Sequence, residues 1–194
     1  MLGKYVIVTE YFDSITLENF IKECKYDQKA ISSIIFQLFE SIQYLHEKSI
    51  IHRDLNCKNI LIDPKTNFIK LIDFGVSRFC HSIEEIISPQ GNLKYRVPSI
   101  FEFSRNPFVG DLWSAVIVAL SVMTKKKITT RRAEQFIEQK EQINPSISSL
   151  KANVIEILIK TMRILEDMEN KDDNSDEREN ILEIQSLFHK AAHI

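Results

Sequence analysis

Apolar residues recur along this chain at the period of an α-helix. Steps of three and four residues predict an amphipathic helix that ends near 46–49, and its apolar positions are Ile31, Ile34, Ile35, Leu38, Ile42 and Leu45. The segment from Val116 to Met123 is apolar on nearly all sides, which is typical of a helix packed all round. Further helices are predicted over 133–143, 154–165 and 181–192, with a charged loop at 171–180. The pattern therefore predicts a mainly α fold.

Two short apolar runs, 59–62 and 68–72, interrupt the helical pattern. The residues between them are Asp63-Pro64-Lys65-Thr66-Asn67, a composition that favours a tight connection. The sequence therefore predicts a β-hairpin. Its two strands would hold Asn59, at the start of the first, near Asp73, directly after the second.

Polar residues beside this hairpin suit phosphoryl transfer. That reaction needs an oriented nucleophile, metal ions on the phosphates, and charge placed where the transition state develops it. Asp54 can accept a proton from an attacking hydroxyl or orient it. Asn59 and Asp73 supply hard oxygen ligands of the kind that Mg²⁺ prefers.

The run His52-Arg53-Asp54-Leu55-Asn56-Cys57-Lys58-Asn59, followed by Asp73-Phe74-Gly75, resembles the catalytic and metal-binding loops of eukaryotic protein kinases. The resemblance implies an α+β family fold, a kinase-like large lobe in which a short β-hairpin carries both loops. It also implies ATP and Mg²⁺ as cofactors, Asp54 as the catalytic residue, and Asn59 and Asp73 as ligands of metal and nucleotide. His52 is expected to pack in a column with Phe74, and Arg53 to bind a phosphorylated activation segment, since a guanidinium grips phosphate with two hydrogen bonds.

The resemblance continues downstream. The stretch 91–99 is similar to the family's Gly-Thr-x-x-Tyr-x-Ala-Pro-Glu, and Asp111-Leu112-Trp113-Ser114 to the start of its central buried helix, where Asp111 would hold the catalytic-loop backbone. The structural or regulatory residues that the resemblance implies are His52, Arg53, Phe74, Gly75, Tyr95, Pro98, Asp111 and Trp113.

Some positions depart from the family pattern. Asn92, Val97 and Ser99 differ within 91–99, and Val116 replaces a glycine. Ser99 stands where the family has a glutamate paired with a late arginine, which Arg178 resembles. Loss of one partner of a buried pair typically costs about 3–5 kcal/mol, so Arg178 is expected to turn to solvent or the peptide-docking floor to loosen.

The type of substrate hydroxyl stays open. Asn56 stands where serine/threonine kinases usually carry a lysine that contacts the transferred phosphate, and Lys58 stands where tyrosine kinases often carry arginine. We favour serine or threonine over tyrosine.

Only the hinge and the large lobe are covered by the resemblance. Residues 5–12 resemble the last small-lobe strand running into the hinge, with Thr9 at the gatekeeper position and Glu10, Tyr11 and Phe12 offering backbone hydrogen bonds to adenine. Leu61 would form the floor of the adenine site. We expect one kinase-like domain over 1–194, with strand and hinge at 1–12 and the large lobe at 13–194. The four glycines form no glycine-rich phosphate loop, so a small lobe would come from further sequence or from another polypeptide.

Composition narrows the function classes. A net charge of −2 gives no signal for nucleic-acid binding. Lys125-Lys126-Lys127 and Arg131-Arg132 form a solvated face or, alternatively, favour an acidic substrate or partner. The three cysteines lack metal-ligand spacing and suggest reduced thiols. The longest apolar stretch, 115–123, is far short of the roughly 20 residues that span a bilayer, and no targeting signal stands out, so a cytoplasmic location without membrane contact is the default.

Two function classes remain open at this stage. The first is a protein kinase acting on a protein substrate, in which Ser82 or Ser88 is either a phosphate acceptor that pairs with Arg53 or an ordinary loop serine. The second is a truncated, kinase-like regulatory lobe that binds a partner kinase and has no activity of its own.

Overall fold

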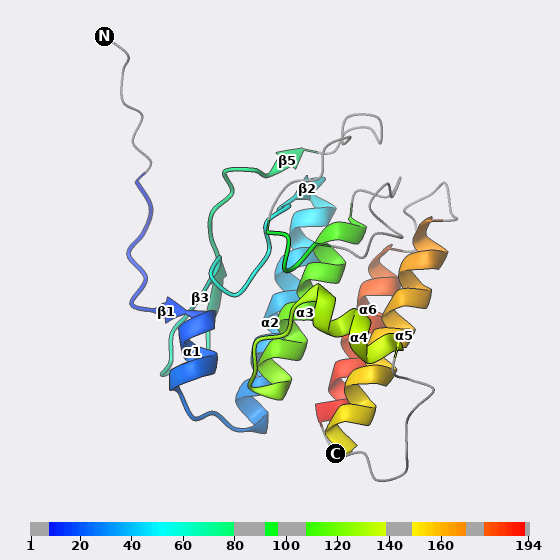
Figure 1. Ribbon diagram of the computed structural model, residues 1–194. Helices are drawn as coiled ribbons and strands as arrows, with labels where there is room; N and C mark the ends of the chain where they lie inside the picture. Colours follow the sequence, from blue (N-terminus) through cyan, green and yellow to red (C-terminus); the bar gives the residue numbers. More distant parts are fainter. Residues whose placement is uncertain (1–7, 80–91, 97–107, 139–148, 170–176, 193–194) are drawn as a thin grey trace.

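The first predicted helix is confirmed, and it extends beyond its apolar stripe. It runs over Gln28–Glu47 (α2) in a computed structural model that describes residues 8–79, 92–96, 108–138, 149–169 and 177–192 (Figure 1). Asp27 caps its start by accepting a hydrogen bond from the Ala30 N–H at 2.8 Å, which satisfies one free donor of the first turn. All six positions of the apolar stripe are buried, so this face holds α2 against the core.

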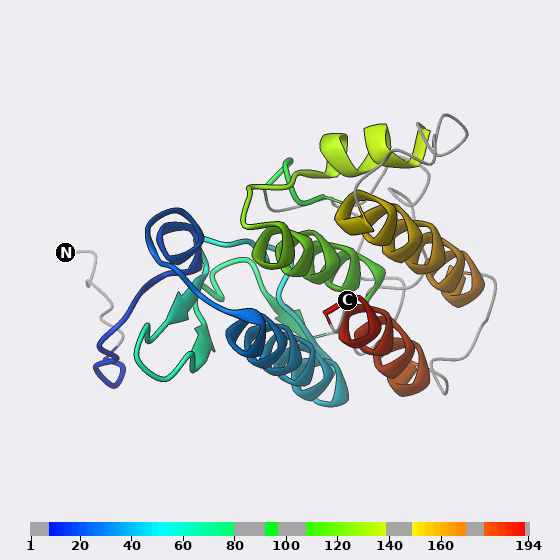
Figure 2. The same cartoon turned by 90° about the horizontal axis from the view of Figure 1, so that it is seen from below.

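The all-round apolar segment forms the central helix α3 (Val109–Thr124), in which every residue from Asp111 to Met123 is buried. Figure 2 shows α3 between α2 on one side and α5 (Ser149–Glu169) on the other, with α4 (Thr130–Glu138) outside them. The last helix, α6 (Glu177–Ala192), packs against both α2 and α5. The fold is therefore mainly α, as the sequence predicted.

Two small antiparallel sheets lie beside this helical layer (Figure 1). In the first, β3 (Ile60–Ile62) lies between β1 (Ile15–Thr16) and β4 (Ile69–Leu71). The second pairs β2 (Ile50–Ile51) with β5 (Arg78–Phe79). A short helix, α1 (Leu17–Glu23), follows β1 directly, and Thr16 caps it by accepting from the Asn19 N–H at 3.2 Å.

The predicted hairpin between β3 and β4 is confirmed. Asp63 shapes its turn by accepting hydrogen bonds from the Lys65 N–H at 2.8 Å and from the Thr66 hydroxyl at 2.7 Å. Gln37, on α2, holds the hairpin to the helices, because its Nε2 donates to the Asn67 carbonyl at 2.8 Å and its Oε1 accepts from the Ile69 N–H at 3.1 Å. One amide side chain thus takes the place of a strand neighbour on the outer side of β4.

The small-lobe strand and hinge expected over 5–12 lie only partly within the residues that the structure describes. Residues 8–12 have no strand pairing, and Val8 and Tyr11 are 90% and 88% exposed. An apolar run becomes a strand only when another strand accepts its backbone hydrogen bonds, and among the described residues the first to pair in this way are Ile15 and Thr16. Residues 5–7 lie outside the described part of the chain.

Several element bounds also differ from the predictions. Residues 177–180, expected in a charged loop, belong to α6, while α5 is longer than its predicted range of 154–165. α4 begins at Thr130 rather than 133, and residues 139–143 of that prediction lie outside the described residues. Within the described ranges, no helix combines the length and apolar character needed to cross a membrane.

Candidate active site

The segment 52–59 connects β2 to β3, and the first turn of α3 fixes its backbone. The buried carboxylate of Asp111 accepts a hydrogen bond from the His52 N–H at 2.6 Å through Oδ2 and from the Arg53 N–H at 2.9 Å through Oδ1. Arg53 has a φ of 68°. This left-handed conformation is uncommon for a residue with a side chain and persists where surrounding contacts impose it. Asp111 supplies two such contacts.

Asp111 remains ionised in this buried position. Burial by itself would raise its pKa, but the hydrogen bond and charge of His46, together with the two backbone N–H groups, outweigh burial and hold the pKa of Asp111 below its ordinary value. His46 Nε2 lies 3.3 Å from Asp111 Oδ2, and its ring lies 4.5 Å from the ring of Phe108. The carboxylate is therefore fully surrounded by donors.

Asp54, the candidate base, is held at both carboxylate oxygens. Asn59 Nδ2 donates to Oδ2 at 2.8 Å and to the Asp54 carbonyl at 2.9 Å. The Asn92 N–H donates to Oδ1 at 2.8 Å. The structure thus brings Asp54 and Asn59 together and adds Asn92, which the sequence marked only as a mismatch.

Asn56 also has a role that the sequence did not reveal. Its side chain is 3% exposed, donates to the Asp54 carbonyl at 2.9 Å and accepts from the Lys58 N–H at 2.9 Å. A side-chain amide that bonds the backbone two residues away in both directions stabilises a tight loop. Asn56 therefore braces the segment from inside.

Asp73 lies two residues after the end of β4, next to Ile72, which is the residue opposite Asn59. The ladder of the hairpin continues beyond β3 and β4, because the Ile72 N–H donates to the Asn59 carbonyl at 2.9 Å. Asp73 has a φ of 64°, and its Oδ1 accepts from the Gly75 N–H at 3.4 Å. A Cβ at Gly75 would lie 3.2 Å from that same oxygen, so the glycine leaves room for the carboxylate.

This pair fits a magnesium ion by its chemistry. Among the described contacts, neither Asn59 Oδ1 nor Asp73 Oδ2 accepts a hydrogen bond, which leaves an amide oxygen and a carboxylate oxygen for a cation. Mg²⁺ is typically held by one or two such protein oxygens and keeps water and phosphate in its remaining positions. The described residues contain no group of three or more His, Cys, Asp or Glu that could hold a metal, so a cation here would depend on this pair and on phosphate.

The rings of His52 and Phe74 contact each other in a tilted arrangement. Their ring centroids are 4.8 Å apart, and His52 Nε2 lies 3.0 Å from the Ile72 carbonyl.

Partial burial and the like charge of Arg78 lower the pKa of Arg53, while Asp111 acts in the opposite direction. The charge of Arg78 therefore acts on Arg53, the residue directly before the candidate base.

Two of the residues expected around adenine, Glu10 and Phe12, contact one face of the hairpin. Leu61 is opposite Lys70 across β3 and β4, and Lys70 Nζ forms an ion pair with Glu10 and lies 4.7 Å from the Phe12 ring centroid. Thr9 and Tyr11 are exposed. The structure thus brings Glu10 and Phe12 to the face that carries Leu61.

The segment 92–96 is fixed to α3 and α4. The Ser114 hydroxyl donates to the Tyr95 carbonyl at 2.9 Å, Trp113 Nε1 donates to the Thr130 hydroxyl at 3.0 Å, and that hydroxyl donates to the Arg96 carbonyl at 2.6 Å. The predictions for Gly91, Pro98, Ser99, Ser82 and Ser88, and the outcome expected for the Arg178 side chain, lie outside the described part of the chain.

Comparison with known proteins identifies the family. The family model described as protein kinase domain matches residues 3–190. A probable serine/threonine-protein kinase of Encephalitozoon cuniculi is 32% identical over 124 residues, which is 64% of this chain and 23% of that protein. The probable serine/threonine-protein kinase WNK4 of Arabidopsis thaliana is 34% identical over 125 residues, 61% of this chain and 21% of that protein. Protein kinase kin1 of Schizosaccharomyces pombe is 34% identical over 118 residues, 59% of this chain and 13% of that protein.

Each alignment spans less than a quarter of the relative's own length. The family match nevertheless covers nearly all of this chain, and it agrees with the mainly α fold and with the hairpin that carries Asn59 and Asp73. The chain belongs to the protein kinase family.

Proposed function

We propose that this chain is the large lobe of a protein kinase that transfers the terminal phosphate of Mg²⁺-bound ATP to a serine or threonine hydroxyl of a protein. The observation that carries the proposal is the grouping of three motif residues at one end of the β3–β4 hairpin. Asn59 bonds the Asp54 carboxylate at 2.8 Å, and the Asn59–Ile72 backbone bond puts Asp73 next to them. The names of the relatives support serine or threonine as the acceptor.

In this proposal Asp54 orients the substrate hydroxyl and accepts its proton. The donors from Asn59 and Asn92 fix the carboxylate in one orientation, and each carboxylate oxygen still has a lone pair for the hydroxyl. Asn59 Oδ1 and Asp73 would hold Mg²⁺, which neutralises charge on the phosphates when bound. The face of the hairpin with Leu61, Glu10 and Phe12 would receive adenine.

Arg53 and Arg78 would bind a phosphate on the activation segment. Arg53 is partly buried and Arg78 is exposed, the charge of Arg78 acts on Arg53, and guanidinium groups match phosphate geometry. A phosphate bound between them would offset the repulsion between the two cations.

A regulatory lobe without activity is the second candidate. Asn56 favours it, because the residue at the position of the usual phosphate-contacting lysine is buried and bonds the loop backbone instead. Loss of one contact that stabilises the transition state commonly lowers turnover by roughly 10²–10³-fold.

Mg²⁺-dependent thermal stabilisation by ATP tests nucleotide binding. At about five times the dissociation constant, a ligand stabilises the folded state by about 1 kcal/mol, which raises Tm by roughly 2–4 °C for a chain of this size. We expect this shift with Mg²⁺ and ATP, and its loss with EDTA or in Asp73→Asn. Asp13→Asn, an exposed aspartate outside the site, is the matched control. No shift at millimolar nucleotide would remove ATP from the function.

Phosphate transfer separates the enzyme from the regulatory lobe. A chain that binds Mg²⁺-ATP and labels a serine- or threonine-containing protein, with labelling abolished in Asp54→Asn, is a kinase. A chain that binds Mg²⁺-ATP equally well as wild type and as Asp54→Asn, but labels nothing in either form, is the regulatory lobe.

A further inference from the structure

A pocket of about 210 Å³ lies beside the segment 52–59, and its lining is strongly basic. Four lysines and a single carboxylate line it: Lys22 and Glu18 from α1, and Lys125, Lys126 and Lys127 from the connection after α3. The lysine cluster noted in the sequence therefore faces a concave site rather than only open solvent.

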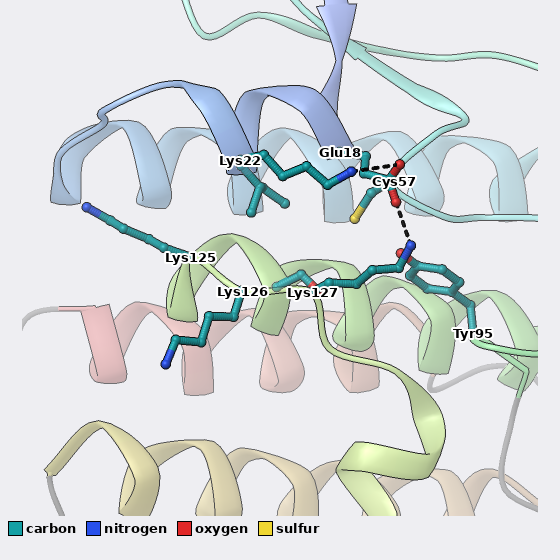
Figure 3. A pocket seen from close by; sticks show the side chains of 9 residues that line it. Glu18, Lys22, Cys57, Tyr95, Lys125, Lys126 and Lys127 are labelled. Atoms are coloured by element: carbon teal, nitrogen blue, oxygen red, sulfur yellow. Dashed lines mark hydrogen bonds and ion pairs between the residues drawn. The ribbon is translucent and has the colours of Figure 1, made fainter.

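The lysines that line the pocket differ in the partners of their ammonium groups. Figure 3 shows Lys22 and Lys127 pointing toward the Glu18 carboxylate, at 3.4 Å and 2.5 Å respectively. The hydrogen bond from Lys127 is the main cause that lowers the pKa of Glu18, so this carboxylate is ionised at neutral pH. Lys125 Nζ donates to the Tyr26 carbonyl at 2.7 Å. The Lys126 residue is exposed, and its side chain makes no hydrogen bond or ion pair within the described residues, whereas its backbone N–H donates to the Ser121 carbonyl at 3.2 Å. Lys22 and Lys127 thus share the Glu18 carboxylate, and the Lys126 ammonium group can pair with another anion.

The buried part of the pocket is uncharged. Cys57 and Tyr95 lie there, next to the Glu18 carboxylate (Figure 3). Burial raises the pKa of Cys57 to about 11 and also raises the pKa of Tyr95. Both groups therefore stay protonated, and the pocket contains no anion other than Glu18 among its lining residues.

The pocket is close to the candidate base along two paths of the chain. Cys57 lies three residues after Asp54, and the Glu18 N–H donates to the Cys57 carbonyl at 2.9 Å. Tyr95 lies three residues after Asn92, whose N–H bonds the Asp54 carboxylate. An extended peptide advances roughly 3.3 Å per residue, so a side chain about two to four residues from a hydroxyl at Asp54 would reach this pocket.

We propose that the pocket binds an acidic side chain of the protein substrate, located two to four residues from the phosphorylated hydroxyl. The inference depends on the proposed function, since it names the substrate class of the same site. The Glu18 carboxylate marks the position that the lysines favour for an anion, and Lys22, Lys126 and Lys127 are the groups that a substrate Glu or Asp would contact. Glu18 competes with that contact, so its neutralisation strengthens binding.

Peptide binding without nucleotide tests the proposal separately from phosphate transfer. Fluorescence anisotropy with the purified chain would compare three labelled peptides that share one serine and differ only in flanking Glu, Gln or Lys. Ion pairs at partly exposed sites are worth up to about fivefold in affinity each, so we expect the Glu peptide to bind roughly fivefold to tenfold more tightly than the Gln peptide. The preference should shrink at high salt, because screening weakens exposed pairs.

Three variants and one matched control locate the effect. Lys126→Gln and Lys127→Gln should each reduce the Glu-over-Gln preference roughly threefold, and Glu18→Gln should increase it by a similar factor. Lys160→Gln is the control, because Lys160 is also half exposed and pairs with one glutamate at 2.5 Å, but on α5. The Lys126 side chain makes no hydrogen bond or ion pair among the described residues, and a change to Gln keeps its backbone bonds, so this variant stays informative if Lys127→Gln is unstable.

The outcomes are distinct. Equal affinity for the Glu and Gln peptides, or a preference that Lys126→Gln changes no more than Lys160→Gln does, would overturn the proposal. Displacement of the labelled Glu peptide by inorganic phosphate at the concentration at which unlabelled Glu peptide displaces it would also overturn it, in favour of a small-anion site. A retained peptide preference in a chain that shows no stabilisation by Mg²⁺-ATP would instead reject the phosphotransferase and leave the acidic-peptide site in place.

Discussion

Removal of the Asp111 carboxylate should destabilise the fold and loosen the segment 52–59. In Asp111→Ala, the buried N–H groups of His52 and Arg53 lose their acceptor, and each unsatisfied buried donor costs about 1–3 kcal/mol. Relaxation of Arg53 from its φ of 68° would recover part of this. We therefore expect a net loss of about 3–5 kcal/mol, which is the range for breaking a buried charged interaction, and a decrease in Tm of roughly 10 °C.

Urea unfolding followed by circular dichroism measures this loss, and hydrogen exchange at the amides of residues 52 and 53 shows where it arises. Asp13→Ala is the matched control, because Asp13 is 80% exposed and its ion pair with Lys65 is 3.9 Å long; such a change is usually within about 0.5 kcal/mol of wild type. If Asp111→Ala were no less stable than Asp13→Ala, or if both amides kept their protection, the account of the segment would be incorrect.

Three further predictions concern the same region. The pKa of Asp111 is lowered in the folded state, so the stability that the ionised carboxylate contributes is fully present above its unfolded-state pKa of about 3.9. That stability is lost as pH falls through the lower folded-state pKa, and the difference in unfolding free energy between wild type and Asp111→Ala should therefore shrink below about pH 4 in acid titrations. Gly75→Ala places a methyl group 3.2 Å from Asp73 Oδ1 and should weaken the thermal shift by Mg²⁺-ATP, while the free energy of unfolding without ligand stays within about 1 kcal/mol of wild type. An unchanged shift would contradict the role given to Asp73. Trp113→Phe removes the 3.0 Å hydrogen bond to Thr130 and should cost about 1–2 kcal/mol in urea unfolding; a neutral effect would show that this bond does not support the segment 92–96.

Local patterns in the sequence were enough to predict α2, the buried part of α3 and the hairpin, but they did not reveal the short helix α1. The apolar stripe of α2, the buried segment of α3 and the turn at 63–67 depend on residues a few positions apart, so periodicity and turn chemistry are sufficient to find them. The strand and hinge expected over 5–12 stay a prediction, because strand formation depends on a partner strand that the run itself does not specify.

Contacts between distant segments could not be predicted from the sequence. Asn92 bonds Asp54 across 38 positions, and Lys127 pairs with Glu18 across 109. No spacing rule reaches so far, because these contacts depend on how the helices pack. Asn56 looked like a defect for the same reason, since its value to the loop is visible only once the backbone around Asp54 is known.

The position of Gln37 has a consequence for how this protein behaves at high concentration. β4 is an outer strand, and an uncovered outer strand offers free N–H and C=O groups on which another chain can grow a sheet. Gln37 occupies the Ile69 N–H and the Asn67 carbonyl at that boundary. These two backbone groups of the hairpin that carries Asn59 are thereby unavailable to the strand of another chain, so loss of the Gln37 amide would open this edge to strand addition.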